Sequence, residues 1–79
     1  MDIAITYCTQ WNYQPKAASL AAELKEKLEL DAKLIGGSGG VFDVVADEKL
    51  IFSKAAEGDQ FPEHEEVIRR LQDYQAASS

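Results

Sequence analysis

Two kinds of hydrophobic periodicity follow one another along the first third of the chain, and each predicts a different element. Residues 2–7 place Ile3, Ile5 and Tyr7 on one side and smaller or polar side chains on the other, which is the period-two pattern of a β-strand. After a loop over residues 8–14 the spacing becomes helical, and Pro15 suits the first turn because its missing N–H is not needed there. The apolar positions of this expected helix are Ala17, Leu20, Ala21, Leu24 and Leu28.

The middle of the chain predicts three short strands. A strand over residues 32–35 leads into the glycine-rich segment 36–40, which we expect to be a hinge or a tight loop. Segments 41–46 and 50–53 are rich in Val, Ile and Phe, and the short joint between them makes them a hairpin. The joint, Asp47-Glu48, lacks glycine, so the sequence leaves its turn type open.

A second helix closes the chain. A loop over residues 54–61 precedes it, and we expect the helix to start at Pro62 and to fray over residues 76–79. Glutamates near its start and arginines further along suit the helix dipole. Its apolar stripe consists of Val67, Ile68, Leu71 and Tyr74.

The element order is therefore strand, helix, strand, strand, strand, helix. A right-handed crossover makes the first two strands parallel, and the hairpin then adds antiparallel strands. We expect a single α/β domain over residues 1–79, with a four-stranded mixed sheet in the order second, first, third, fourth and both helices on one face. The other face would carry Ala4, Thr6 and alternate residues of 41–45, with little to cover it.

Composition excludes several classes of protein. A chain of 79 residues with 46% apolar and 28% charged residues is expected to fold as one small globular domain with a thin core. Its 8 basic and 14 acidic residues give a net charge of −6, which argues against nucleic acid as a partner. The sequence contains neither a long apolar span nor a signal segment, so we expect no membrane partner and a cytoplasmic location.

Cys8 is the single cysteine, so it cannot form an internal disulfide. It lies where the first strand ends, and reactive groups of open α/β sheets collect outside the carboxyl ends of strands. A reactive thiol there would need a pKa lowered by the following helix N-terminus, by Lys16 or by loop amides. The alternative is a small buried hydrophobe, which is a common role of a lone cysteine. Position alone leaves both interpretations open.

Several segments taken in order resemble a known redox family. They are residues 5–10 (Ile-Thr-Tyr-Cys-Thr-Gln) before an alanine- and leucine-rich helix, 36–42 (Gly-Gly-Ser-Gly-Gly-Val-Phe), 50–54 (Leu-Ile-Phe-Ser-Lys) and 58–62 (Gly-Asp-Gln-Phe-Pro). Together they resemble the selenoprotein W, T and H family, also called selenoprotein W-like or Rdx, in its short bacterial form. The resemblance implies a thioredoxin-like two-layer fold with a Cys-x-x-Sec or Cys-x-x-Cys pair in the first loop. It also implies a role in thiol-disulfide exchange or a glutathione-linked antioxidant role, with no bound cofactor and glutathione as co-substrate.

The chain departs from the family pattern at Trp11, where the family places selenocysteine or a second cysteine. An indole has no exchangeable chalcogen, so a two-residue exchange cycle cannot run within this chain and only one-thiol chemistry at Cys8 is left. Trp11 is either a true substitution, presenting an aromatic patch with Tyr7 and Tyr13, or a recoded selenocysteine position, because the codons differ by one base. The coding triplet would decide between these two explanations.

The resemblance also assigns binding residues around the loop. They are Thr9 and Gln10 inside the motif, Ser38, Gly39 and Gly40, whose amides would hold a peptide or glutathione beside Cys8, and Phe61. Phe61 either closes the site from the other side or caps the core under the second helix. A phosphate-binding loop at 36–40 is disfavoured, because no Lys-Ser or Lys-Thr pair follows it and the next element is a strand.

Other polar residues offer little chemistry. His64 lies near the start of a solvated helix among glutamates, with no second His or Cys at ligand spacing, so we expect no metal site. The acidic residues Glu63, Glu65 and Glu66 are interpreted as helix-start electrostatics. Only Cys8 is a candidate nucleophile.

Three functions remain. The first is a thiol redox protein acting through Cys8 on protein thiols or glutathione, a possible thiol-disulfide oxidoreductase whose status as an enzyme Trp11 leaves uncertain. The second is a catalytically silent interaction module that uses the same loop. The third is self-association through the open face of the sheet.

Overall fold

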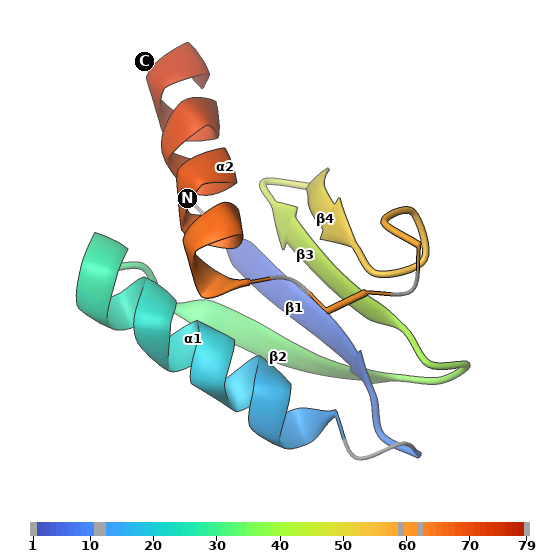
Figure 1. Ribbon diagram of the computed structural model, residues 1–79. Coiled ribbons are helices and arrows are strands. Elements are labelled where there is room, and N and C mark those ends of the chain that lie inside the picture. Colours follow the sequence, from blue (N-terminus) through green and yellow to red (C-terminus); the bar gives the residue numbers. More distant parts are fainter. Residues whose placement is uncertain (1, 11–12, 59, 62, 79) are drawn as a thin grey trace.

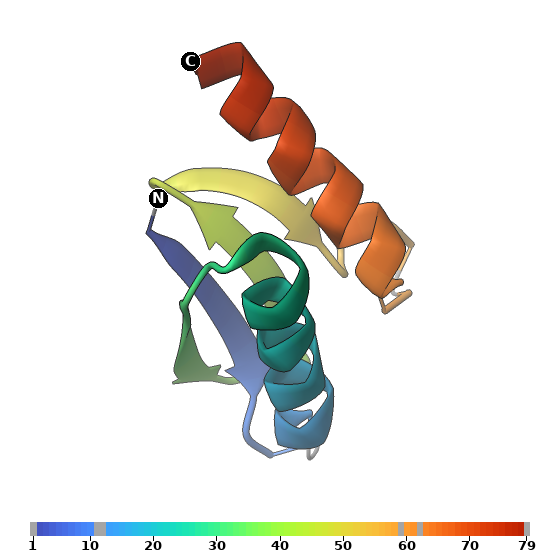
Figure 2. The same cartoon turned by 90° about the vertical axis from the view of Figure 1, so that its left-hand side faces the viewer.

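Four strands form one mixed sheet, and two helices cover one of its faces (Figure 1; Figure 2). The computed structural model describes residues 2–10, 13–58, 60–61 and 63–78. Its elements are β1 (Ile3–Cys8), α1 (Gln14–Leu28), β2 (Ala32–Gly37), β3 (Phe42–Ala46), β4 (Lys49–Ser53) and α2 (His64–Ser78). The order of elements predicted from the sequence is confirmed.

The strand order is β2-β1-β3-β4, which is the order expected from the sequence. β1 and β2 are parallel, with Ile3 opposite Ala32 and Cys8 opposite Gly37. β3 is antiparallel to β1, and β4 is antiparallel to β3. The mixed sheet leaves β2 and β4 at its edges and places the end of β1, where Cys8 lies, between β2 and the segment that leads into β3.

The core lies between the sheet and both helices. Ile3 and Ile5 of β1 contribute to the same buried cluster as Leu24 of α1, which is fully inaccessible to solvent. The cluster also contains Ala17, Leu20, Phe42, Val44, Ala46, Phe52, Val67 and Leu71. Because residues of both helices contact one face of the sheet, the expectation that both helices share a face is confirmed (Figure 2).

The N-terminal end of α1 follows the usual sequence preferences for helix ends, whereas its C-terminal end does not. Pro15 lies in the first turn, as expected, and Tyr13 is the N-cap residue, without a side-chain hydrogen bond to the helix amides. At the other end Glu29 adopts a left-handed conformation with φ of 57°; its N–H donates to the Lys25 carbonyl at 3.0 Å, and the Leu30 N–H donates to the Leu24 carbonyl at 3.3 Å. Glycine is the usual residue at such a position, so this glutamate is held in an unfavourable conformation.

β2 extends two residues further than expected, into the glycine-rich segment. Gly36 and Gly37 pair with Tyr7 and Cys8 of β1, which supplies hydrogen-bonding partners up to its own last residue. A Cβ on Gly37 would lie 2.8 Å from a methyl group of Val41 and 3.1 Å from one of Thr6, so close approach excludes a larger residue. The first two glycines are therefore part of the sheet rather than a hinge.

The hairpin turn at Asp47 and Glu48 has positive φ at both residues, 50° and 70°, as a type I′ turn requires. Asp47 is tied to the start of β1 twice, because its amide donates to the Asp2 carbonyl at 2.8 Å and its carboxylate accepts from the Asp2 amide at 2.8 Å. The Tyr74 hydroxyl of α2 also donates to the Asp47 carboxylate at 3.3 Å. These tertiary contacts hold a turn that the sequence left open.

α2 runs from His64 through Ser78, so its backbone is helical across most of the tail that we expected to fray. Pro62, the expected first residue, lies outside the described residues. The last turns of the helix extend beyond the sheet (Figure 1). No helix within the described part of the chain is long and apolar enough to cross a bilayer.

Arg70 links α2 to β4 and to the turn that follows β4 through hydrogen bonds. Its guanidinium donates to the Ile51 carbonyl at 3.1 Å, to the Glu57 carboxylate at 2.7 Å and to the Glu66 carboxylate at 3.0 Å. It also lies over the ring of Phe52, 5.1 Å from the centroid. The Arg70 hydrogen bond is the main reason why the pKa of Glu66 lies below its ordinary value of 4.5.

Candidate functional site

Cys8 is the last residue of β1 and is fully buried. It does not belong to the cluster beneath the helices, and strand alternation places it on the same face as Ala4 and Thr6. Its partner in the parallel ladder is Gly37, which has no side chain to occupy the neighbouring position. The thiol is therefore enclosed at the carboxyl end of the sheet, and a thiol partner can reach it only after a local opening.

The segment after Cys8 returns to the end of β1. The Thr9 amide and hydroxyl both donate to the Gly37 carbonyl, at 3.2 and 3.3 Å, and the Tyr13 amide donates to the Cys8 carbonyl at 3.3 Å. Gln10 is exposed in the intervening turn. Trp11, at the position where the family has its second chalcogen, lies outside the described residues. The loop is thus anchored at both ends beside the cysteine.

The residues of the glycine-rich segment differ in solvent exposure and in backbone conformation. Ser38 and Gly39 are exposed, whereas Gly40 is buried. Gly39 and Gly40 adopt left-handed conformations, with φ of 73° and 77°. They line a surface depression together with Phe42, Ser53 and Lys54, and neither Cys8 nor Phe61 is among its described lining residues. The segment is therefore joined to Cys8 through the pairing of Gly37 with the end of β1.

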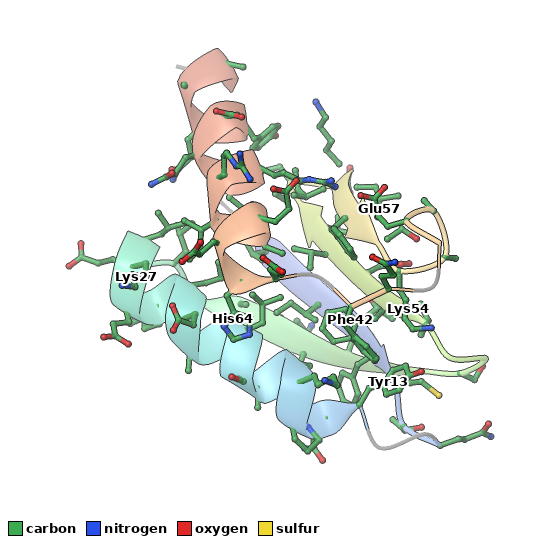
Figure 3. The ribbon with its side chains drawn as sticks, viewed as in Figure 1. Tyr13, Lys27, Phe42, Lys54, Glu57 and His64 are labelled. Carbon is green, nitrogen blue, oxygen red and sulfur yellow. The ribbon has the colours of Figure 1, made fainter. Side chains whose placement is uncertain are left out.

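Phe61 is the centre of an aromatic cluster at the start of β3. Its ring meets the edge of Tyr13 at a centroid distance of 4.6 Å and that of Phe42 at 5.3 Å, both nearly perpendicular. The ammonium groups of Lys16 and Lys54 lie over the same ring, 4.6 and 5.6 Å from its centroid. Figure 3 shows Tyr13, Phe42 and Lys54 gathered at this end of the molecule. Phe61 thus packs against the core and also lines the surface.

The predicted site residues therefore fall on neighbouring surfaces. Thr9, Gly37 and Cys8 are joined by hydrogen bonds and strand pairing, while Gly39 and Phe61 line separate depressions with Phe42 in the walls of both. Trp11 lies outside the described residues, so the prediction that all these residues form one shared site stays a prediction.

Sequence reasoning missed two features of this region. Lys54 is almost fully buried beside the aromatic rings, although it was assigned to a loop, and its amide continues the ladder by donating to the Phe42 carbonyl at 2.9 Å. His64 is half-buried in a pocket shared with α1, although it was expected on a solvated helix. The feature of the sequence that could have predicted the burial of Lys54 is its position directly after the apolar strand 50–53. Among the described residues, no group of three His, Cys, Asp or Glu residues could hold a metal ion.

Comparisons with known proteins agree with this architecture. A solved structure of a protein from Bordetella parapertussis is 32% identical, has a TM-score of 0.85, and the match covers 92% of this chain and 95% of that one. A selenoprotein W-related protein from Vibrio cholerae is 29% identical, with a TM-score of 0.87 and coverage of 92% and 94%. The comparison with curated proteins gave no match.

A family comparison completes the assignment. The sequence model described as the Rdx family matches residues 2–73, which run from the start of β1 into α2. The match includes Cys8, the glycine-rich segment and Phe61, and the solved relatives share the whole mixed sheet and both helices. With sequence and fold in agreement over nearly the full length, this thioredoxin-like α/β chain belongs to the Rdx family.

Proposed function

We propose that the protein is a thiol redox protein that acts through Cys8 alone, forming and resolving mixed disulfides with glutathione or protein thiols. Membership of the Rdx family supports a redox-related role. The single observation that carries the finer assignment is the place of Cys8 at the carboxyl end of β1, where open α/β sheets collect reactive groups.

The chemistry needs two exchange steps with outside thiols. The Cys8 thiolate attacks the glutathione sulfur of a glutathionylated protein thiol, the sulfur–sulfur bond breaks, and the protein thiolate leaves while glutathione stays bound to Cys8. A second glutathione thiolate then attacks the glutathione sulfur of this mixed disulfide and releases the Cys8 thiolate and oxidised glutathione. Trp11 supplies no sulfur, so no intramolecular disulfide forms at any stage.

Burial of Cys8 sets the condition for this cycle. Thr9 and Tyr13 hold the loop against Gly37 and Cys8 through three hydrogen bonds, and these bonds must open before a thiol reaches the sulfur. Local opening of this kind costs less free energy than global unfolding. We therefore expect thiol-disulfide exchange at Cys8 to be slow but to occur in the folded protein.

A second candidate is a catalytically silent interaction module that uses the same loop together with residues 37–40 and Phe61. Full burial of Cys8 favours it, because a structural cysteine is enclosed in the same way. The presence of Trp11 in place of a second chalcogen also favours it, since an aromatic side chain in a loop suits protein recognition.

Mass spectrometry separates the two functions. Wild type, Cys8→Ala and Trp11→Cys are incubated with oxidised glutathione under native conditions and again in urea. The redox proposal expects a glutathione adduct on native wild type, none on Cys8→Ala, and an internal disulfide in Trp11→Cys because the loop spacing allows closure. A wild-type thiol that reacts only in urea contradicts the redox proposal and leaves the interaction module.

Self-association through the open face of the sheet is a further part of the proposal. Ile35 is 39% exposed, and it lies opposite Thr6 in the ladder, on the face away from the helices. Sedimentation velocity over a range of concentrations tests it, with Ile35→Lys expected to shift any dimer to monomer. Identical sedimentation of wild type and Ile35→Lys at every concentration would contradict it.

A further inference from the structure

A pocket of about 270 Å³ opens where the first turn of α1 meets the first turn of α2. Its floor is apolar and consists of Leu20, Phe42 and Phe61, of which the first two are almost fully buried. Its rim carries Lys16 and Ser19 from α1 and His64 from α2. Figure 3 shows His64 at the start of α2 on the side facing α1, with Phe42 on the neighbouring strand β3.

The charge of this pocket is opposite to that of the chain. The protein carries a net charge of −6, yet the described lining of the pocket contains a lysine and a histidine and no carboxylate. The first turn of α1 contains no acidic residue, and no side chain caps its amides. The positive end of the α1 dipole therefore adds to the Lys16 ammonium at the rim, and both favour an anion there.

We propose that this pocket is a docking site for a partner protein, and that it takes an acidic side chain together with the adjacent large apolar side chain. The apolar residue would lie on the exposed part of Phe61, with Leu20 and Phe42 beneath it, and the carboxylate would face Lys16 at the start of α1. The proposal goes beyond the thiol chemistry, because Cys8 is not among the described residues that line the pocket.

The pocket is small. Its volume of about 270 Å³ lies at the lower bound of the range of about 300–1,000 Å³ for pockets that hold drug-sized ligands, so one or two side chains of a peptide fill it. Lys16 keeps its position by lying over the Phe61 ring, so it is held at the rim before a partner arrives. Because the Lys16 ammonium is already held and the apolar floor is preformed, binding of a partner costs less conformational entropy.

The test uses two dipeptide probes that differ only in charge, N-acetyl-Leu-Asp amide and N-acetyl-Leu-Asn amide, in NMR titrations of the ¹⁵N-labelled protein. We expect the aspartate probe to bind about fivefold more tightly, the scale of one partly exposed charge interaction, and to shift the amides of Lys16, Ser19 and His64. Lys16→Gln should remove most of that preference and leave only the part that the α1 dipole supplies. Lys27→Gln, at the other end of α1 (Figure 3), removes the same charge outside the pocket and should preserve it.

Several outcomes would overturn the proposal: equal affinity for the two probes, no detectable binding of either, shifts centred elsewhere, or equal losses in the Lys16 and Lys27 variants. Cys8→Ala keeps this experiment separate from the thiol chemistry, and it should bind the aspartate probe as wild type does. Loss of binding in Cys8→Ala would place the ligand at the thiol and contradict the pocket. A failed glutathione reaction with intact dipeptide binding would refute only the redox function.

Discussion

Arg69 and Arg70 are neighbours on α2, and the structure predicts very different consequences of replacing them. The Arg70 side chain is 33% exposed and contacts β4 and the following turn, whereas the Arg69 side chain is 70% exposed and pairs with Glu66 on its own helix. Arg70→Ala leaves the Ile51 carbonyl without its charged donor. Arg69→Ala removes the same number of charges and breaks no tertiary contact described for that side chain.

The loss for Arg70→Ala can be estimated from its contacts. A hydrogen bond from a charged donor to a carbonyl contributes about 1.5–3 kcal/mol, and a cation over an aromatic ring at a partly exposed site about 0.5–1 kcal/mol. The Glu57 pair is exposed to solvent and adds little. We expect a total of about 2–4 kcal/mol, against about 4–12 kcal/mol for the whole stability of a chain of this length.

Urea unfolding followed by far-UV circular dichroism measures this difference. Arg70→Ala should lower the unfolding midpoint with an unchanged slope, and its thermal midpoint should fall by about 10–30 °C. Arg69→Ala is the matched control and should change either midpoint only slightly. Equal losses in the two variants, or a loss below about 0.5 kcal/mol for Arg70→Ala, would show that the tertiary contacts of Arg70 do not stabilise the fold.

Three further predictions concern the stability of the fold. Leu24→Ala, at a fully buried position, should cost about 2–5 kcal/mol in urea unfolding, and a loss under about 1 kcal/mol would contradict its place in the core. Glu29→Gly should raise stability by about 0.5–1 kcal/mol because φ is 57° there, whereas Glu26→Gly inside the same helix should lower it by about 1 kcal/mol. The lowered pKa of Glu66 means that its contribution is present above its ordinary pKa of 4.5 and is lost as the pH falls below it. Urea midpoints should therefore fall more steeply with acid in wild type than in Glu66→Gln, and parallel curves would contradict this.

The sequence by itself determined the elements, their order and the sheet topology. The alternation of Ile3 and Ile5 and the helical spacing of Leu20 and Leu24 are local signals, because backbone geometry fixes the periods at two and about 3.6 residues. The right-handed crossover then set the face of the parallel pair that the first helix covers. Each of these signals lies within a single segment of regular period, so the elements and their order could be predicted without knowledge of any tertiary contact.

Only the tertiary structure decided the environment of individual side chains. Cys8 is fully buried although it is the last residue of β1, and the turn at Asp47 is held by Asp2, a residue 45 positions away. The sequence likewise contains no local signal that separates Arg69 from Arg70, and it placed His64 on a solvated helix. Such contacts join residues far apart in the chain, and local periodicity contains no information about which distant surfaces meet. The fold was therefore readable from the sequence, whereas the accessibility of the thiol and the pocket between the helix starts depended on how the elements pack.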